Sequence, residues 1–201
     1  MVYEWEQATT SFISKWPRSG LFFDFMHFMS YPGILGLILW TVVLLLQRKF
    51  LSSKIFWNAA IVSVLLGDLV SRRILKFFFQ RPRPLFSQSV CADSSCWGFV
   101  SSHSTNITAF VTVLSLYDPR NLIWGLPLVS LVSFSRLYLL EHYPSDVIGG
   151  IILGFLVGHL TYFVSKKIKD AYESKKQKGE LNDEYRYHEN LHAAVSKSKK
   201  F

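Results

Sequence analysis

Cysteine is scarce in this chain, since Cys91 and Cys96 are the only two among 201 residues. Two thiols supply too few ligands for a metal site, because structural zinc sites use four ligands. Acidic residues are also few, at 14 against 22 lysines and arginines, and they form no cluster of carboxylate ligands. The sequence therefore excludes a metal centre built on cysteine and predicts no metal site elsewhere.

The chain also lacks a basic start before a clean apolar stretch, so we expect no cleaved signal peptide. Residues 3–30 instead mix aromatic side chains with charged ones. This composition favours an interfacial amphipathic helix, or two helices broken at Pro17. An irregular N-terminal extension is the alternative. On the first interpretation, residues 1–31 form an N-terminal interfacial segment.

Long apolar runs dominate the middle of the chain, and they lack the polar faces at a period of 3.6 residues that helices of a soluble bundle show. Half of the residues are hydrophobic, and the mean hydropathy is +0.23 despite a polar tail. We therefore predict an all-α, integral-membrane helical bundle over residues 32–165. Its five expected spans are about 32–47, 55–75, 104–118, 122–140 and 146–164.

Basic residues in the short loops set the expected orientation of the bundle. Lys49 and Lys54 lie between the first two spans, Arg120 lies between the third and fourth, and Lys166 follows the fifth. With five spans these positions share one side of the membrane, which should be the cytoplasm. We therefore predict a basic cytoplasmic tail over residues 166–201, partly helical or disordered.

Three short clusters lie where an apolar run meets a polar loop, and the five-span topology puts all three on the non-cytoplasmic face. They read Lys76-x6-Arg83-Pro84, Ser101-Ser102-His103 and Ser135-Arg136-x5-His142-x3-Asp146. Together they supply three fixed cations, two histidines and a carboxylate that can orient one histidine. These groups suit the binding of a phosphate and the cleavage of a bond to it, without a metal ion or organic cofactor.

The first cluster supplies cations of two kinds. The guanidinium of Arg83 suits bidentate phosphate binding, and Lys76 adds a mobile point charge. Asp68 and Arg72 precede Lys76 at four-residue intervals on one helical face, and we expect them to form a structural ion pair. Basic side chains that reach toward the membrane interface are the alternative, but they do not explain the spacing. Arg81 has no basic residue seven positions earlier, so it should only support the site.

The second and third clusters each place a histidine beside a helix start. Ser101 is a good N-cap for the third span, whose free N–H groups can bind an anion. Asp146 can accept a hydrogen bond from one ring nitrogen of His142, which fixes the tautomer and leaves the other nitrogen free to attack. Glu141 is adjacent to His142, and we expect it to face solvent.

With these residues the sequence resembles the type 2 phosphatidic acid phosphatase family, whose fold is shared with the vanadium haloperoxidases. The resemblance covers about residues 68–160. The first and third clusters match the family pattern at every defining position. The second departs from the usual Pro-Ser-Gly-His at Val100 and Ser102.

The resemblance implies a division of roles among the cluster residues. His142 would be the nucleophile that forms a phosphohistidine. His103 would protonate the leaving oxygen and then act as base for the attacking water, and Asp146 would complete the catalytic set. The implied phosphate-binding residues are Lys76, Arg83, Ser101, Ser102 and Arg136.

We therefore expect a metal-independent lipid phosphate or diphosphate phosphatase that acts at the outer leaflet, with no cofactor and no nucleic-acid partner. Undecaprenyl diphosphate or a similar bacterial lipid phosphate is the favoured substrate, which implies a bacterial inner membrane and a periplasmic active site. Phosphatidate, phosphatidylglycerophosphate and a lipid A phosphate are alternatives.

A soluble vanadium haloperoxidase is disfavoured by the five spans. A non-catalytic membrane interaction protein would lack a catalytic residue, and none is missing.

Two further patterns concern structure. Cys91 and Cys96 lie in an outward loop, where a disulfide would contribute about 2 kcal/mol by loop entropy, and two free thiols are the alternative. Gly150, Gly154 and Gly158 form a ridge of small residues at four-residue intervals on the fifth span. Such a ridge predicts close helix packing.

Overall fold

The computed structural model describes residues 2–31, 54–85 and 96–198, so the first predicted span, 32–47, lies outside the described residues. The described chain divides into two compact units, Met1–Tyr162 and Phe163–Phe201. Its regular elements are all helices, which confirms the predicted all-α class for these residues.

The N-terminal segment forms two helices, α1 (Glu4–Ser14) and α2 (Leu21–Met29). They are separated by the turn that contains Pro17, and Gly20 adopts a φ of 87° just before α2 begins. The prediction of two helices broken at Pro17 is therefore confirmed, and the alternative of an irregular extension is wrong. Whether the helices lie at a membrane interface stays a prediction.

The second predicted span is a helix in three consecutive parts. These are α4 (Lys54–Leu69), a π-helical segment η1 (Val70–Leu75) and α5 (Lys76–Phe79). Ser71 and Lys76 are both buried, although residues five apart would diverge on an α-helix. The wider i to i+5 turn of a π-helix brings them to the same inner face. The predicted Asp68–Arg72 ion pair is present, with Arg72 Nε 2.8 Å from Asp68 Oδ1.

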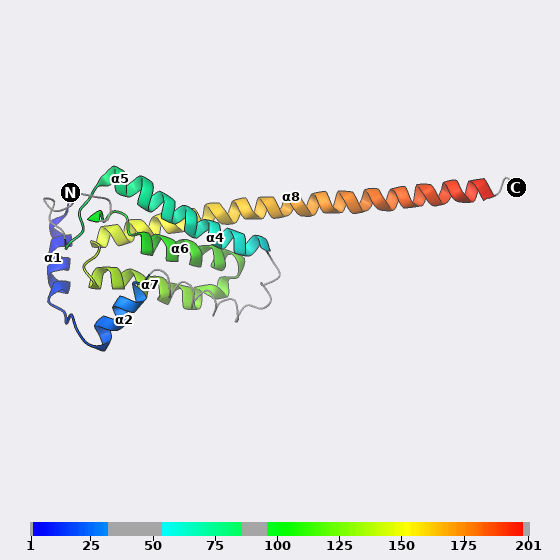
Figure 1. Ribbon diagram of the computed structural model, residues 1–201. Helices are drawn as coiled ribbons and strands as arrows, with labels where there is room; N and C mark the ends of the chain where they lie inside the picture. The colour runs from blue at the N-terminus through cyan, green and yellow to red at the C-terminus, as the bar shows by residue number, and fades with distance from the viewer. Residues whose placement is uncertain (1, 32–53, 86–95, 199–201) are drawn as a thin grey trace. The chain divides into compact units, whose positions relative to one another are not determined.

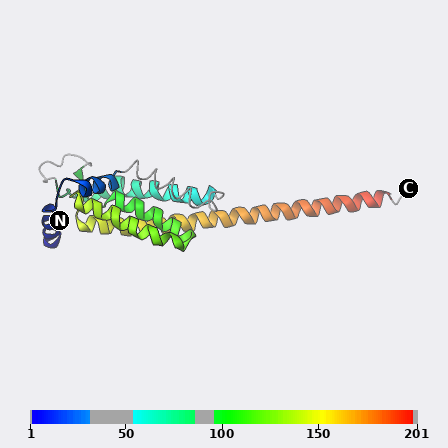
Figure 2. The same cartoon turned by 90° about the horizontal axis from the view of Figure 1, so that it is seen from below.

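The bundle is organised around α6 (Ser102–Tyr117), which packs against α4 on one side and α7 (Leu122–Tyr138) on the other. A short 3₁₀ helix, η3 (Pro119–Asn121), joins α6 to α7. The three helices run alongside one another in both views of the molecule (Figures 1 and 2). Phe56, Ala60, Val113 and Leu114 are among the buried residues of the core between α4 and α6.

Large apolar side chains cover outward faces of the helices. Leu65 on α4, Ile123 and Leu126 on α7 and Phe155 on the last helix, α8 (Pro144–Ser198), are more than half exposed. Exposed apolar faces of this kind suit contact with lipid. By length and composition, one described helix could cross a membrane, Pro144–Gly179 with a mean hydropathy of 2.0. Helices α4, α6 and α7 have 16, 16 and 17 residues, which places them below the 18 residues that this criterion requires.

The last helix, α8 (Pro144–Ser198), has 55 residues and does not end where the fifth apolar run ends at Val164. The tail is therefore helical as far as Ser198. The sequence alone had left open whether the tail is helical or disordered. The second unit taken by itself carries exposed polar side chains as far as Gly179. One ion pair on its surface joins Lys169 to Glu173 at 3.8 Å.

The glycine ridge packs α8 directly on α6. A Cβ atom at Gly150 would lie 2.6 Å from the Ser101 carbonyl oxygen, and one at Gly154 would lie 2.3 Å from the Thr105 carbonyl oxygen. At Gly158 a Cβ would meet Thr112 Cβ at 2.7 Å. Because backbone atoms cannot move aside as a side chain can, the two helices depend on glycine for their separation. The prediction of close packing is confirmed.

Replacing Gly154 with leucine should therefore separate α6 from α8 and lower the stability of the bundle. Overpacking of a close contact costs roughly 1–3 kcal/mol. A fall in the thermal unfolding midpoint of detergent-purified protein would measure this cost. Gly179→Ala is the control, because a Cβ at Gly179 meets nothing within 4 Å. Equal midpoints for the two variants would contradict the assignment of Gly154 to helix packing.

Candidate active site

Two loop segments, residues 81–83 and 96–98, pair in antiparallel fashion. The Arg83 N–H donates to the Cys96 carbonyl at 3.0 Å, and the Gly98 N–H donates to the Arg81 carbonyl at 2.7 Å. The Arg83 side chain also donates from Nε to the Trp97 carbonyl at 3.4 Å. This pairing carries residues 81–83, at the end of the first cluster, toward the start of α6.

Asp146, at the start of α8, is a fully buried carboxylate with fixed donors. Oδ1 accepts a hydrogen bond from Arg81 Nη1 at 2.8 Å, and Oδ2 accepts one from the Tyr143 N–H at 2.9 Å. The Asp146 carbonyl also accepts from the Ser101 N–H at 2.9 Å, which joins the starts of α6 and α8. A Cβ at Gly98 would lie 2.8 Å from Oδ2, so only glycine lets this loop lie against the carboxylate.

His142 is buried beside this carboxylate, in the loop between α7 and α8. Nδ1 of the ring lies 3.5 Å from Asp146 Oδ2, and it has no hydrogen-bond partner within the described part of the chain. The predicted pair is therefore together, but its hydrogen bond is not formed in this structure. Burial lowers the pKa of His142 well below its usual value, and the charges of Arg136, Arg83 and Lys76 act in the same direction. The imidazole is thus held neutral.

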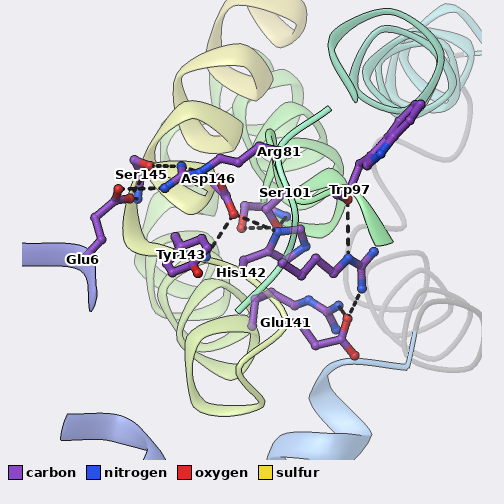
Figure 3. Close-up of polar contacts among 12 residues, drawn as sticks. Glu6, Arg81, Trp97, Ser101, Glu141, His142, Tyr143, Ser145 and Asp146 are labelled. Atoms are coloured by element: carbon purple, nitrogen blue, oxygen red, sulfur yellow. Dashed lines mark hydrogen bonds and ion pairs between the residues drawn. The ribbon is translucent and has the colours of Figure 1, made fainter. Parts of the chain in front are cut away.

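Glu141 lies between two of the predicted phosphate-binding cations. Its Oε2 pairs with Arg136 Nη2 at 2.8 Å and also with Arg83 Nη1, and its side chain is only 32% exposed. In Figure 3, Glu141 lies below His142, away from Glu6 and Asp146. The expectation that Glu141 faces solvent is wrong, because two guanidinium groups converge on its carboxylate and hold it within the site.

Lys76 and His103 are the remaining predicted site residues from the first and second clusters. Lys76 is buried, and no ion pair of the described residues holds its ammonium group. Its electrostatic neighbours include Arg83, Arg136 and Asp146. His103 lies in the first turn of α6, and its buried Nε2 has no hydrogen-bond partner among the described residues. The three clusters of the sequence therefore meet at one place.

The two serines of the second cluster have structural contacts. Ser101 is the N-cap of α6, as predicted, and its Oγ accepts a hydrogen bond from the Ser104 N–H at 3.4 Å. Ser102 Oγ accepts one from Ser71 Oγ at 2.9 Å, which joins α6 to the π-helical segment. Both serines are buried. The Ser102 oxygen therefore accepts a hydrogen bond in the contact between the helices, and its own O–H can still donate to an anion.

The sequence reasoning missed Glu6, which comes from α1 and is fully buried at the site (Figure 3). Glu6 Oε2 pairs with Arg81 Nη2 at 2.7 Å, and Oε1 accepts a hydrogen bond from the Ser145 hydroxyl. Arg81 thus joins Glu6 to Asp146, which agrees with its predicted supporting role. One available signal was helical spacing, because Glu6 lies seven residues before the buried Ile13 on the inner face of α1.

Cys96 is buried where the loop pairs with residues 81–83. Cys91 lies outside the described residues, so the Cys91–Cys96 disulfide stays a prediction.

Glu6→Ala should detach α1 from the site, because it leaves Arg81 with one of its two carboxylates. Breaking a buried ion pair costs about 3–5 kcal/mol. Although burial alone raises the pKa of Glu6, hydrogen bonds from Ser145 and Tyr3 and the charge of Arg81 hold that pKa below its usual value. The stabilisation is therefore complete above the usual pKa of a glutamate and is lost as pH falls through the lowered value.

Hydrogen exchange of the α1 backbone measures this attachment. The protection factor, which is the intrinsic exchange rate at each pH divided by the observed rate, should fall in Glu6→Ala at neutral pH, and in the unmodified protein only on acidification. Glu4→Ala is the matched control, since Glu4 is an exposed glutamate on the same helix. Equal exchange in both variants would show that the buried ion pair does not hold α1.

Comparisons with known proteins identify relatives of this chain. A lipid A 4'-phosphatase from Porphyromonas gingivalis is 33% identical over 53% of this chain and 50% of its own length. The undecaprenyl-diphosphatase BcrC from Bacillus subtilis is 28% identical over 52% of this chain and 55% of its own. This chain therefore spans about half the length of these two relatives.

Two solved structures share the fold. The crystal structure of Aquifex aeolicus LpxE aligns with a TM-score of 0.61 at 20% identity, over 79% of this chain and 95% of that one. A transmembrane PAP2-type phosphatidylglycerolphosphate phosphatase from Bacillus subtilis aligns with a TM-score of 0.55 at 22% identity, over 83% and 85%. These alignments confirm the helical membrane fold. The family model of the PAP2 superfamily matches residues 55–170, and the chain belongs to this superfamily.

Proposed function

We propose that this protein is an integral-membrane lipid phosphate phosphatase that works through a phosphohistidine on His142. The observation that carries the proposal is the convergence of Lys76, Arg83 and Arg136 around the buried imidazole of His142. Three cations from separate elements can bind the oxygens of one phosphoryl group and stabilise the charge that spreads over them in the transition state.

In the first step, the free ring nitrogen of His142 attacks phosphorus while the bond to the leaving oxygen breaks. Asp146 receives a hydrogen bond from Nδ1 and stabilises the positive charge that develops on the ring; a shortening of about 0.5 Å would form this bond. His103 donates a proton to the leaving oxygen. In the second step, His103 takes a proton from water, which attacks the phosphohistidine and releases phosphate.

Substrate binding must change the contacts of Glu141. Its carboxylate pairs with Arg83 and Arg136, the two guanidinium groups to which a phosphate would bind in the proposed mechanism. Each guanidinium has five N–H donors, so phosphate oxygens can share them or displace the carboxylate. Ser101 and Ser102 would contribute through the start of α6, where backbone N–H groups favour an anion.

The favoured substrate is undecaprenyl diphosphate or a similar bacterial lipid phosphate. The similarity to an undecaprenyl-diphosphatase supports this choice. The similarity to a lipid A 4'-phosphatase and to a phosphatidylglycerolphosphate phosphatase supports the two alternatives. A non-catalytic membrane interaction protein is disfavoured, because no catalytic residue of the three clusters is missing from the sequence.

We further propose that the site opens on the periplasmic face of a bacterial inner membrane, with the tail after Lys166 in the cytoplasm. The distribution of basic loop residues supports this orientation. Cys91 and Cys96, which we propose to be disulfide-bonded, would then lie outside the cytoplasm. A membrane-impermeant maleimide should label them in intact cells only after reduction, and labelling without reductant would contradict the disulfide.

Phosphate release from a panel of lipid monophosphates and diphosphates tests the proposed function. Purified protein should release phosphate equally with and without a chelator, and vanadate should inhibit it because vanadate mimics five-coordinate phosphorus. Loss of activity in chelator that a divalent ion restores would overturn the metal-independent mechanism. Absence of release from every lipid would overturn the function itself.

The two histidines should differ in their dependence on the leaving group. Expelling a lipid alkoxide requires protonation, whereas an activated aryl phosphate leaves with little help. His103→Ala should therefore form phosphoenzyme far more slowly from the lipid than from the aryl ester, by roughly 10²–10⁴-fold. His142→Ala should form none from either. Trapping of phosphoenzyme by His142→Ala but not by His103→Ala, in a single turnover, would reverse the two roles.

A further inference from the structure

Arg72 is a further cation beside the site, and the proposed mechanism does not use it. It lies in the π-helical segment Val70–Leu75, four residues before Lys76, and its side chain is 53% exposed. Asp68 holds the guanidinium through Nε at 2.8 Å. In the part of the chain that the structure describes, no other carboxylate pairs with Arg72, so the two terminal amino groups can bind a further anion.

Two contacts fix this segment beside the first turns of α6. Ser71 Oγ donates to Ser102 Oγ at 2.9 Å, and Asn106 Nδ2 donates to Asp68 Oδ1 at 3.1 Å. His103 lies between Ser102 and Asn106 along α6. Arg72 is accordingly among the cations that act on His103, together with Arg136 and Lys76.

The position of Arg72 along its helix differs from that of the cations around the phosphoryl group that His142 attacks. Four residues correspond to no more than about 6 Å along the helix axis, toward the middle of the bundle. Arg72 lies one turn from Lys76, and the Ser71–Ser102 and Asp68–Asn106 contacts place that turn beside the part of α6 that carries His103. In the proposed mechanism His103 faces the leaving oxygen, so Arg72 lies where the leaving group emerges.

Leaving groups differ in charge between the two substrate classes. When a lipid monophosphate is cleaved, the leaving group is an alcohol once His103 has protonated it. When a lipid diphosphate is cleaved, the bond from phosphorus to the bridging oxygen breaks, and its electron pair stays on a lipid monophosphate that is already anionic. Only the second leaving group gains from a fixed guanidinium beside the bridging oxygen.

We propose that Arg72, positioned by Asp68 and Asn106, binds the lipid-proximal phosphate of a diphosphate substrate and makes the site selective for diphosphates. The proposal rests on the proposed function, because it takes His142 as nucleophile and His103 as the acid at the leaving oxygen. It identifies the preferred substrate class as a lipid diphosphate, whose terminal phosphoryl group is transferred to His142.

Farnesyl diphosphate and farnesyl monophosphate form the test pair, because they share one tail and differ by one phosphate. Initial rates are measured by chromatography of farnesyl monophosphate and farnesol, respectively. Arg72→Gln should lower kcat/KM for the diphosphate by roughly 10- to 100-fold, as expected for the loss of a hydrogen bond between charged groups. The monophosphate should change by less than about threefold. Arg72→Lys, which keeps the charge, should retain part of the diphosphate activity.

Arg73→Gln is the matched control, since Arg73 is the next residue and is exposed. It should leave both rates unchanged. Asp68→Asn keeps Arg72 but removes its partner, and it should also lower diphosphate activity selectively. Equal losses on the two substrates in Arg72→Gln, or no loss, would overturn the subsite.

The unmodified protein separates this proposal from the proposed function. Activity on the monophosphate alone would overturn the subsite and leave the phosphatase mechanism intact. Activity on neither farnesyl compound, nor on any other lipid phosphate, would overturn the proposed function and the subsite together.

Discussion

The site depends on the buried ion pair between Arg81 and Asp146. Arg81 is shared between the carboxylates of Asp146 and Glu6, and both carboxylates are fully buried. Burial of two negative charges is tolerated only because the guanidinium and several N–H and O–H donors satisfy them. The pair fixes Asp146 at the start of α8, and thereby fixes the group beside which His142 lies.

Helix packing determines the distances between the Arg81–Asp146 pair and the other polar groups of the site. The glycines of α8 allow its backbone to touch α6, and the same contact brings Ser101 to Asp146. On the other side of α6, the Ser71–Ser102 contact sets the position of the π-helical segment and of Lys76. Because Lys76 and His103 come from different helices, their approach is determined by backbone packing and does not rely on mobile loops.

The sequence predicted the parts of this arrangement that follow from spacing and chemical type. The helical class, the break at Pro17, the Asp68–Arg72 pair and the Ser101 cap all follow from local rules, and the structure agrees with them. Glu6 could not be found in this way, because its partners Arg81 and Ser145 are 75 and 139 residues away. The position of Glu141 was missed for a related reason: Arg136 is only five residues away, but Arg83, its second partner, is 58 residues away.

Charge pairing around the site suggests why a phosphate would bind. Each arginine near His142 and His103 has a carboxylate partner: Arg72 with Asp68, Arg81 with Asp146 and Glu6, and Arg83 and Arg136 with Glu141. Among the described residues of the site, Lys76 is the cation without such a partner. Arg83 and Arg136 share a single carboxylate, so this side of the site has an excess of positive charge. An anion with several oxygens can satisfy that excess at both guanidinium groups and Lys76 at once, which one carboxylate cannot do.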